Sequence, residues 1–184
     1  MCHLVANLLL FFVSFLHRNN NETVAIKLET LSDKKSKPRL SQEYEYYQQL
    51  GNHEGIPAIF MYEKFNEKNA LVMELLGPNL FDLYKKCGRK FSLPTVKEIA
   101  IQVIDRLEYI HSKYLIHCDI KPENILMGCT SSNKENILHL VDFGLSKKYV
   151  TSESGKHIPF KKKKGAGSGT MRYMSINTHL GKSK

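Results

Sequence analysis

Hydrophobic positions in the first half of the chain change between strand spacing and helix spacing. Residues 24–27 (VAIK) form a short β-branched run, and residues 71–76 (LVMELL) form an apolar run closed by the breaker Gly77-Pro78, so both predict strands. Between them, apolar and aromatic residues recur at helical spacing over residues 40–50. These helical positions are Leu40, Tyr44, Tyr47 and Leu50. The mixture of strands and helices predicts an α+β fold.

A second helical pattern follows Pro94 and continues for about four turns. Its apolar positions are Val96, Ile99, Ala100, Val103, Leu107 and Ile110. The spacing predicts a buried helix that delivers the chain to His117.

A run of polar residues after that helix carries the strongest chemical signal. Residues 117–124 read H-x-D-x-K-x-x-N, and a D-F-G sequence follows whose Asp142 stands 18 residues after Asn124. This spacing is typical of phosphoryl transfer, in which catalysis consists mainly of positioning and charge stabilisation. Asp119 is predicted to orient a substrate hydroxyl and accept its proton, and Lys121 to neutralise charge on the moving phosphoryl group. Asn124 and Asp142 offer oxygen ligands for Mg²⁺.

Lys27 is the last residue of V-A-I-K, a motif whose lysine pairs with the α- and β-phosphates of ATP and with a helix glutamate. Glu43 lies beside the apolar stripe of the helix over residues 40–50, so its carboxylate can reach inward. We therefore predict that Lys27 and Glu43 pair and that both belong to a nucleotide site.

The strand over residues 71–76 and the Gly-Pro breaker after it predict the place of adenine. A purine packs among apolar side chains and hydrogen-bonds to a few polar groups, here the extended backbone from Glu74 to Leu76. Asn79 and Asp82 lie one helical turn further along the chain and are predicted to lie near the ribose.

Four segments together resemble the casein kinase I family of serine/threonine protein kinases. They are residues 77–80 (GPNL), 121–124 (KPEN), 156–160 (KHIPF) and 169–181 (GTMRYMSINTHLG). The last segment is the most specific, because S-I-N at residues 175–177 stands where most kinases carry A-P-E. The resemblance covers about residues 19–181.

The resemblance implies a protein-kinase-like two-lobed fold that binds ATP and Mg²⁺. It assigns catalytic or nucleotide-binding roles to five positions, which are Lys27, Asp119, Lys121, Asn124 and Asp142. With the positions inferred above, the predicted cofactor-binding residues are Lys27, Glu43, Glu74, Leu76, Asn79, Asp82, Asn124 and Asp142. Arg172 with the nearby Lys161 and Lys164 is implied as an anion site for acidic or already phosphorylated protein substrates.

Positive charge is concentrated toward the carboxyl-terminal end of the sequence. Residues 141–184 hold ten Lys or Arg against two acidic residues, so they carry +8 of the chain's +9. Such a cluster attracts anionic partners and raises their encounter rate. It fits either a solvated activation loop or a docking site for acidic substrates. Nucleic acid and membrane surfaces are disfavoured as partners, because no aromatic residue interrupts Lys161–Lys164 as a base-stacking surface requires.

The chain also departs from the family pattern. No G-x-G-x-x-G loop precedes Lys27, and a kinase domain needs on the order of 250 residues, whereas this chain has 184. We expect an apolar non-family segment (1–18), an incomplete small lobe (19–74), and a hinge with a truncated helical large lobe and activation segment (75–184). Without late helices, the apolar face of the helix over residues 96–110 should be partly uncovered.

Residues 4–16 are mainly apolar and allow three interpretations: a signal-peptide core, an apolar strand of the small lobe, or a non-native start. They are too few to span a membrane, which takes about 20 residues. The signal peptide is the minor interpretation, because no Lys or Arg precedes the segment and no A-x-A site follows it.

The four cysteines form no C-x-x-C pair and show no disulfide spacing, which fits a reducing compartment. We therefore expect a cytoplasmic or nuclear protein. Cys118 replaces the arginine that usually precedes the catalytic aspartate, so control by an activation-loop phosphate is doubtful.

Two function hypotheses remain open. The first is an ATP- and Mg²⁺-dependent kinase that phosphorylates Ser or Thr on acidic or primed proteins. The second is a catalytically inactive kinase-like fragment that acts as a binding or interfering module. Retention of the polar catalytic positions favours the first, and loss of the Gly-rich loop favours the second. No feature predicts the oligomeric state.

Overall fold

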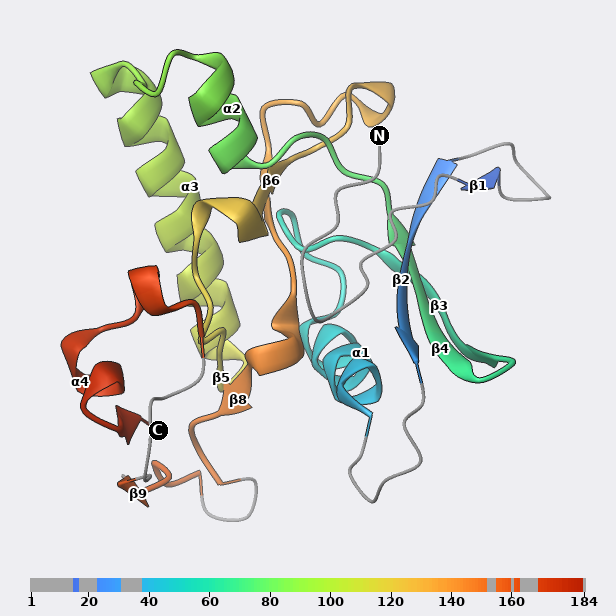
Figure 1. The fold of residues 1–184 in the computed structure, drawn as a ribbon, viewed down its shortest axis with the longest axis vertical. Helices are drawn as coiled ribbons and strands as arrows, with labels where there is room; N and C mark the ends of the chain where they lie inside the picture. Colours follow the sequence, from blue (N-terminus) through green and yellow to red (C-terminus); the bar gives the residue numbers. More distant parts are fainter. Residues whose placement is uncertain are drawn as a thin grey trace. The chain divides into compact units, whose positions relative to one another are not determined.

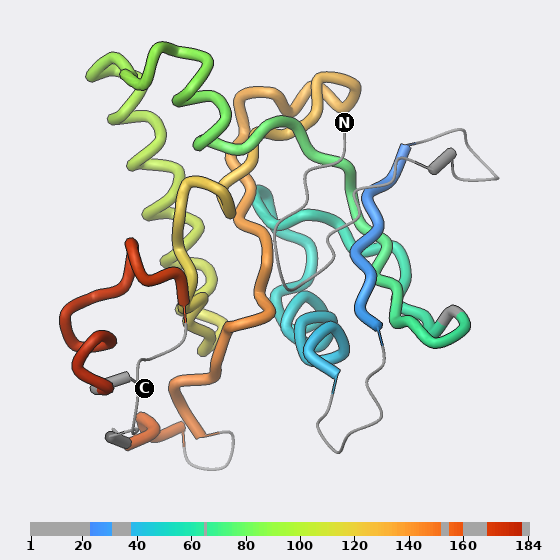
Figure 2. Tube along the Cα trace, in the orientation of Figure 1, coloured from blue at the N-terminus to red at the C-terminus, as the bar shows by residue number. Residues whose placement is uncertain are grey.

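The computed structural model describes residues 15–16, 23–30, 38–151, 155–159, 161–162 and 169–183, which Figure 2 traces in colour. The chain divides into two compact units. The first unit contains residues 1–78 and 126–144, and the second contains residues 79–125 and 145–184. Neither unit is continuous along the sequence.

The first unit is built on a four-stranded antiparallel sheet in the order β1-β2-β4-β3 (Figure 1). Its strands are β1 (Phe15–Leu16), β2 (Thr23–Thr30), β3 (Ile59–Phe65) and β4 (Lys68–Glu74). The strand predicted over residues 24–27 is confirmed as part of β2. The strand predicted over residues 71–76 is confirmed as far as Glu74, where β4 ends, and Leu75 and Leu76 lie in an irregular segment. Because Phe15 pairs with Val24, the strand interpretation of residues 4–16 holds for its last two residues, and residues 4–14 lie outside the described part.

Helix α1 (Arg39–Leu50) contacts β2, β3 and β4 and confirms the predicted helix over residues 40–50. It begins where the Glu29 carboxylate of β2 accepts hydrogen bonds from the backbone N–H groups of Arg39 (2.9 Å) and Leu40 (3.1 Å). This contact satisfies two donors that a helix start leaves unpaired. The helix ends at Gly51, whose positive φ of 65° suits a glycine after a helix.

The first unit also contains most of β6 (Ile125–Met127), the strand β7 (Leu138–Leu140) that pairs with it, and the 3₁₀ helix η2 (Thr130–Ser132). The 3₁₀ helix η3 (Phe143–Leu145) begins in this unit. The backbone N–H of Leu140 donates to the carbonyl of Gly55 (2.9 Å), which attaches β7 to the segment after α1. Phe143, at the start of η3, is fully buried in the core of this unit.

The second unit is mainly helical, with α2 (Leu80–Lys86), α3 (Leu93–Ser112) and α4 (Ile176–His179). Asn79, Ser92 and Ser175 cap these helices, because the side chain of each accepts a backbone N–H of the first turn. The shorter elements are β5 (Leu115–Ile116) paired with β8 (Lys147–Lys148), β9 (Lys161–Lys162) paired with β10 (Lys182–Ser183), and the 3₁₀ helices η1 (Pro122–Asn124) and η4 (Met171–Tyr173).

Helix α3 exists as predicted, but the prediction that it is buried is wrong for most of its length. Only Arg106 and Ile110 are buried, whereas Val96, on the predicted apolar stripe, is 46% exposed and Ala100 on the same stripe is also exposed. The periodicity shows which face of the helix is apolar, and the described residues leave much of that face uncovered. The expectation of a partly uncovered apolar face is therefore confirmed. No helix in the described part of the chain is long and apolar enough to cross a membrane.

Candidate functional site

Lys27 and Glu43 form a buried ion pair in the first unit. Lys27 lies in the middle of β2, and Glu43 lies one turn into α1, on the face that contacts the sheet. The Lys27 Nζ is 2.6 Å from Glu43 Oε2 and 2.9 Å from Oε1, and the two side chains are only 3% and 1% exposed. The pairing predicted from V-A-I-K and the helix stripe is therefore present.

Asp142 joins this pair and completes what we call the lysine cluster (Lys27, Glu43 and Asp142). Its Oδ1 lies 2.8 Å from Lys27 Nζ, so one ammonium group faces two carboxylates. Burial lowers the pKa of Lys27, but the attraction of Glu43 and Asp142 outweighs burial and raises the pKa above its usual value. Burial also raises the pKa of Glu43, against the opposing attraction of Lys27. Lys27 is therefore a protonated cation inside the first unit.

Tyr47 of α1 positions the D-F-G sequence, a role that the helical spacing of the sequence does not indicate. Its hydroxyl accepts the backbone N–H of Asp142 (3.2 Å), and its ring meets the Phe143 ring edge-on at 5.0 Å. Burial holds the pKa of Tyr47 well above its usual value, so the hydroxyl stays neutral. Asp142 has a φ of 67°, a conformation that is uncommon outside glycine and needs such support.

Gly144 keeps space open beside the lysine cluster. A Cβ atom at this position would lie 3.3 Å from Asp142 Oδ1 and 3.3 Å from Glu43 Oε2, so a side chain would crowd both carboxylates. The Asp142 side chain is 29% exposed and can therefore meet a ligand. Its hard carboxylate oxygens are the type of donor that Mg²⁺ prefers.

Asp119 forms the centre of a second polar cluster, which lies in the second unit and which we call the aspartate cluster (Asp119, Lys121, Asn124 and Thr170). Asp119 Oδ2 lies 2.8 Å from Lys121 Nζ, and Oδ1 accepts the backbone N–H of Thr170 at 2.8 Å. The Asn124 side-chain N–H group donates to the Asp119 carbonyl (2.9 Å) and to its Oδ2 (3.3 Å). The Asn124 amide oxygen is therefore the group left to meet a cation.

The carboxylate of Asp119 is held in its ionised form. Burial raises its pKa, but the hydrogen bonds from Lys121 and Thr170 outweigh burial, so the pKa lies below its usual value. Lys121 Nζ also donates to the Thr170 hydroxyl (2.9 Å), which links the two partners of Asp119. Nothing in the spacing of the sequence indicates the contact of Thr170 with Asp119, because the two residues stand 51 positions apart.

The loop that carries Asp119 is fixed by backbone contacts. The buried His117 accepts the Asp119 N–H through Nδ1 (3.3 Å), and the Ser146 hydroxyl donates to the His117 carbonyl (3.3 Å). Cys118 has a φ of 67°, and a Cβ atom on Gly169 would lie 2.8 Å from the Cys118 carbonyl oxygen. Gly169 has a φ of 121°, so a glycine is required there for both reasons.

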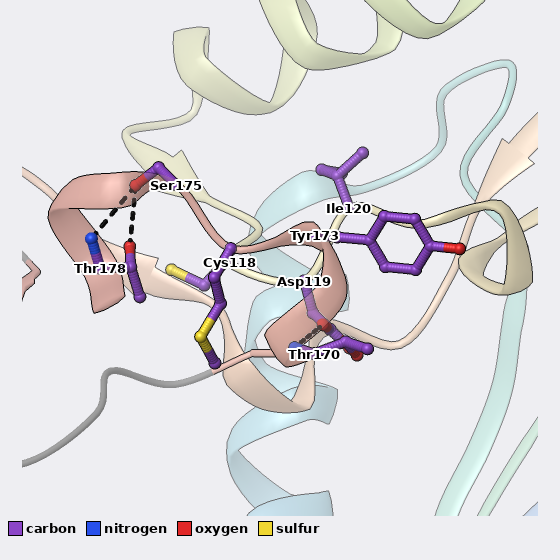
Figure 3. A pocket seen from close by; sticks show the side chains of 8 residues that line it. Cys118, Asp119, Ile120, Thr170, Tyr173, Ser175 and Thr178 are labelled. Atoms are coloured by element: carbon purple, nitrogen blue, oxygen red, sulfur yellow. Dashed lines mark hydrogen bonds between the residues drawn. The ribbon is translucent and has the colours of Figure 1, made fainter. Parts of the chain in front are cut away.

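A pocket adjoins the aspartate cluster (Figure 3). Its volume is about 220 Å³, and Asp119 and Thr170 lie at one part of its wall. The hydroxyl groups of Ser175 and Thr178 point toward one another at a distance of 3.1 Å. The remaining lining residues are Cys118, Ile120, Tyr173 and Met174.

The residues predicted to bind adenine and ribose make contacts of their own. The Glu74 carboxylate is bound by Lys134 and by the backbone N–H of Ala58, so it serves the protein scaffold. Leu76 is half-buried in the irregular segment after β4. Asn79 Oδ1 accepts the Asp82 N–H (2.8 Å), and this pair caps α2. The contacts predicted for these residues with a nucleotide remain predictions.

The structure describes only part of the predicted anion site. Arg172 lies exposed in η4. Lys161 lies in β9 with its backbone alone described, and Lys164 lies outside the described residues. The grouping of these three residues also remains a prediction.

Comparison with known proteins identifies relatives over most of the sequence. The protein kinase domain family matches residues 12–177. The casein kinase I homolog RAG8 of Kluyveromyces lactis is 47% identical over 163 residues, which are 89% of this chain and 30% of the relative. The casein kinase I homolog 2 of Schizosaccharomyces pombe is 45% identical over 163 residues, 89% of this chain and 37% of the relative. The chain thus spans about a third of the length of these relatives.

Proposed function

Because the chain belongs to the protein kinase family, and within it to the casein kinase I group, we propose that it transfers the γ-phosphoryl group of ATP to Ser or Thr residues of proteins. The observation that carries the proposal is the aspartate cluster. An ionised carboxylate, a lysine ammonium and an amide are held together beside a pocket by several short hydrogen bonds. Such fixed charge is what phosphoryl transfer requires.

On the nucleotide side, Lys27 supplies the positive charge that binds the α- and β-phosphates. Glu43 and Asp142 hold its ammonium in place, so little conformational freedom is lost when a phosphate arrives. Asp142 and Asn124 are the residues that would hold Mg²⁺, since both offer hard oxygen donors. The bound ion would neutralise charge on the phosphate oxygens.

On the substrate side, Asp119 orients the attacking hydroxyl and receives its proton. A carboxylate with a lowered pKa is a weak base, so Asp119 first fixes the hydroxyl and then takes its proton late, once the bond to phosphorus has begun to form. Lys121, bound to both Asp119 and Thr170, is placed to neutralise the developing charge. Lys121 thus neutralises charge, and Asp119 accepts the proton.

We further propose that the substrates are acidic or already phosphorylated proteins. The +8 balance of residues 141–184 supports this proposal, as does the exposed Arg172. A second candidate function is a kinase-like binding module without catalysis. It is favoured by one observation, the lack of a G-x-G-x-x-G sequence before Lys27.

Nucleotide binding provides the first test. Mg·ATP at millimolar concentration is expected to raise the melting temperature of the wild-type chain, because it binds the native state in preference to the unfolded one. Lys27→Ala should reduce that rise, since it removes the phosphate-binding cation. Lys64→Ala in β3, which removes an exposed lysine, serves as the control and should keep the full rise. The ATP site would be contradicted by a well-folded wild type whose melting temperature does not respond.

Substrate charge provides a second test. Replacing Lys161–Lys164 with Ala should weaken binding of phosphorylated or acidic peptides and leave neutral peptides nearly unaffected. The difference should shrink as salt rises, because exposed charges act over about 8–10 Å at physiological ionic strength. Arg172→Ala should cost more than any single lysine, because a guanidinium grips phosphate with two hydrogen bonds. Titrations of matched phosphorylated and neutral peptides at low and high salt measure the change in affinity. If both peptides lose affinity equally, Lys161–Lys164 belong to a solvated loop and not to a substrate site.

A further inference from the structure

The segment of residues 74–78, which we call the hinge segment, follows β4 and is anchored at both ends. At its start, the Glu74 N–H donates to the Ala58 carbonyl (2.8 Å). At its end, the Gly77 N–H donates to the Met127 carbonyl (2.8 Å), and the Met127 N–H donates to the Pro78 carbonyl (3.0 Å). Among the described residues, the backbone hydrogen bonds found outside helices and strands do not involve Leu75 or Leu76. The peptide groups of Leu75 and Leu76 thus lie between two segments of backbone that hydrogen bonds hold in place.

The side chain of Glu74 adds a second anchor at the start of the hinge segment. Its Oε1 lies 2.7 Å from Lys134 Nζ, and its Oε2 accepts the Ala58 N–H (3.1 Å). Burial raises the pKa of Glu74, but hydrogen bonds from Lys134 and Ala58 outweigh burial and lower it. The Glu74 side chain is 13% exposed and that of Lys134 is 41% exposed. Both carboxylate oxygens are therefore engaged by neighbours in the first unit.

Lys134 is itself fixed within the loop of residues 128–137, which joins β6 to β7 and follows β6 in Figure 1. Its N–H donates to the Cys129 carbonyl (3.1 Å), and its carbonyl accepts the Ile137 N–H (2.9 Å). A Cβ atom on Gly128 would clash with the backbone of Lys134, and a Cβ atom on Gly77 would lie 2.8 Å from the Gly128 carbonyl oxygen. The loop therefore packs directly against the hinge segment.

We propose that Lys134 is a positioning residue for the nucleotide. Through Glu74, it holds the peptide groups of Leu75 and Leu76 in the orientation that binds the adenine ring. An ion pair that is partly open to solvent, as this one is, contributes little to global stability. Its effect here is instead to keep a short backbone segment ordered before the ligand arrives, which lowers the entropic cost of binding. This inference rests on the proposed ATP-binding function. It gives a role in nucleotide binding to the loop of residues 128–137, which lies outside the kinase motifs.

The experiment compares Lys134→Ala with Glu135→Ala, a variant of its exposed neighbour in the same loop. Amide hydrogen exchange of the peptide covering residues 73–79 is measured in the full chain without nucleotide. Lys134→Ala should speed exchange in this peptide, and Glu135→Ala should not. For Mg·ATP, we expect Lys134→Ala to raise KM about three- to fivefold, the range of one partly exposed ion pair, with little change in kcat.

Rescue and coupling separate positioning from a general structural effect. Lys134→Arg keeps the charge and should restore both the exchange rate and KM. The double variant Lys134→Ala with Glu74→Gln should differ little from Glu74→Gln alone, because both changes break the same contact. Additive effects, or a KM change equal to that of Glu135→Ala, would overturn the proposal.

The outcomes also separate this inference from the proposed function. A wild type that binds no Mg·ATP would overturn the ATP site and, with it, the nucleotide role of Lys134. A wild type that binds Mg·ATP, with exchange and KM unchanged in Lys134→Ala, would overturn the role of Lys134 alone.

Discussion

Replacing Asp119 with Asn is expected to lower the rate of phosphoryl transfer by about 10²–10⁴-fold, the loss typical of removing a general base. Asn keeps the size of the side chain and can still accept the Thr170 N–H, so the loop should keep its shape. It cannot take up the hydroxyl proton, and it no longer carries the charge that pairs with Lys121. The measurement is the initial rate at saturating Mg·ATP and acidic protein substrate.

Glu98→Gln provides the matched control, because it makes the same chemical change at an exposed position of α3. Its rate should equal that of the wild type. An Asp119→Asn rate within a few-fold of the wild type would show that the measured transfer does not depend on Asp119.

Replacing Lys27 with Met is expected to reduce the free energy of unfolding by about 3–5 kcal/mol, the cost of leaving one partner of a buried ion pair unpaired. Glu43 is 1% exposed and would lose its nearest cation. Equilibrium denaturation in guanidinium chloride measures the loss. The double variant Lys27→Met with Glu43→Leu should recover much of it, because no buried charge from that pair remains.

This destabilisation should depend on pH. The pKa of Glu43 is raised by burial, so the folded state holds its proton more tightly than the unfolded state does. Stability linked to Glu43 is therefore largest at low pH and falls as pH rises through the folded-state pKa. Without Lys27 the effect should grow, and the loss in Lys27→Met should be larger at about pH 8 than at about pH 5. The exposed Lys64→Met should show neither the loss nor its pH dependence, and the same behaviour in Lys27→Met would contradict the buried pair.

Local contacts of the candidate site could be predicted from the sequence. Asp119, Lys121 and Asn124 lie within one short loop, so their spacing alone brings them together. The Lys27–Glu43 pair could be predicted from one strand motif and one helical stripe, because each pattern indicates which face of its element points toward the core.

Contacts between distant residues could not be predicted in this way. The bonds from Tyr47 to Asp142, from Thr170 to Asp119 and from Lys134 to Glu74 join residues 95, 51 and 60 positions apart. Each depends on how separate elements pack, which no local spacing records.

The burial of α3 was mispredicted for a related reason. An apolar stripe shows that a helix has one face suited to a core, but it does not show whether another element covers that face. Val96 belongs to the stripe and is nevertheless 46% exposed, which illustrates the difference.

Phosphate transfer by the wild-type chain separates an enzyme from an inactive binding module. The 184-residue chain is incubated with γ-labelled Mg·ATP and an acidic phosphoacceptor protein, and the labelled residues are then identified. We expect label on Ser or Thr of the acceptor, and its loss in Asp119→Asn. Absence of label from a folded chain that binds Mg·ATP would contradict the proposed kinase activity and leave a nucleotide-binding module.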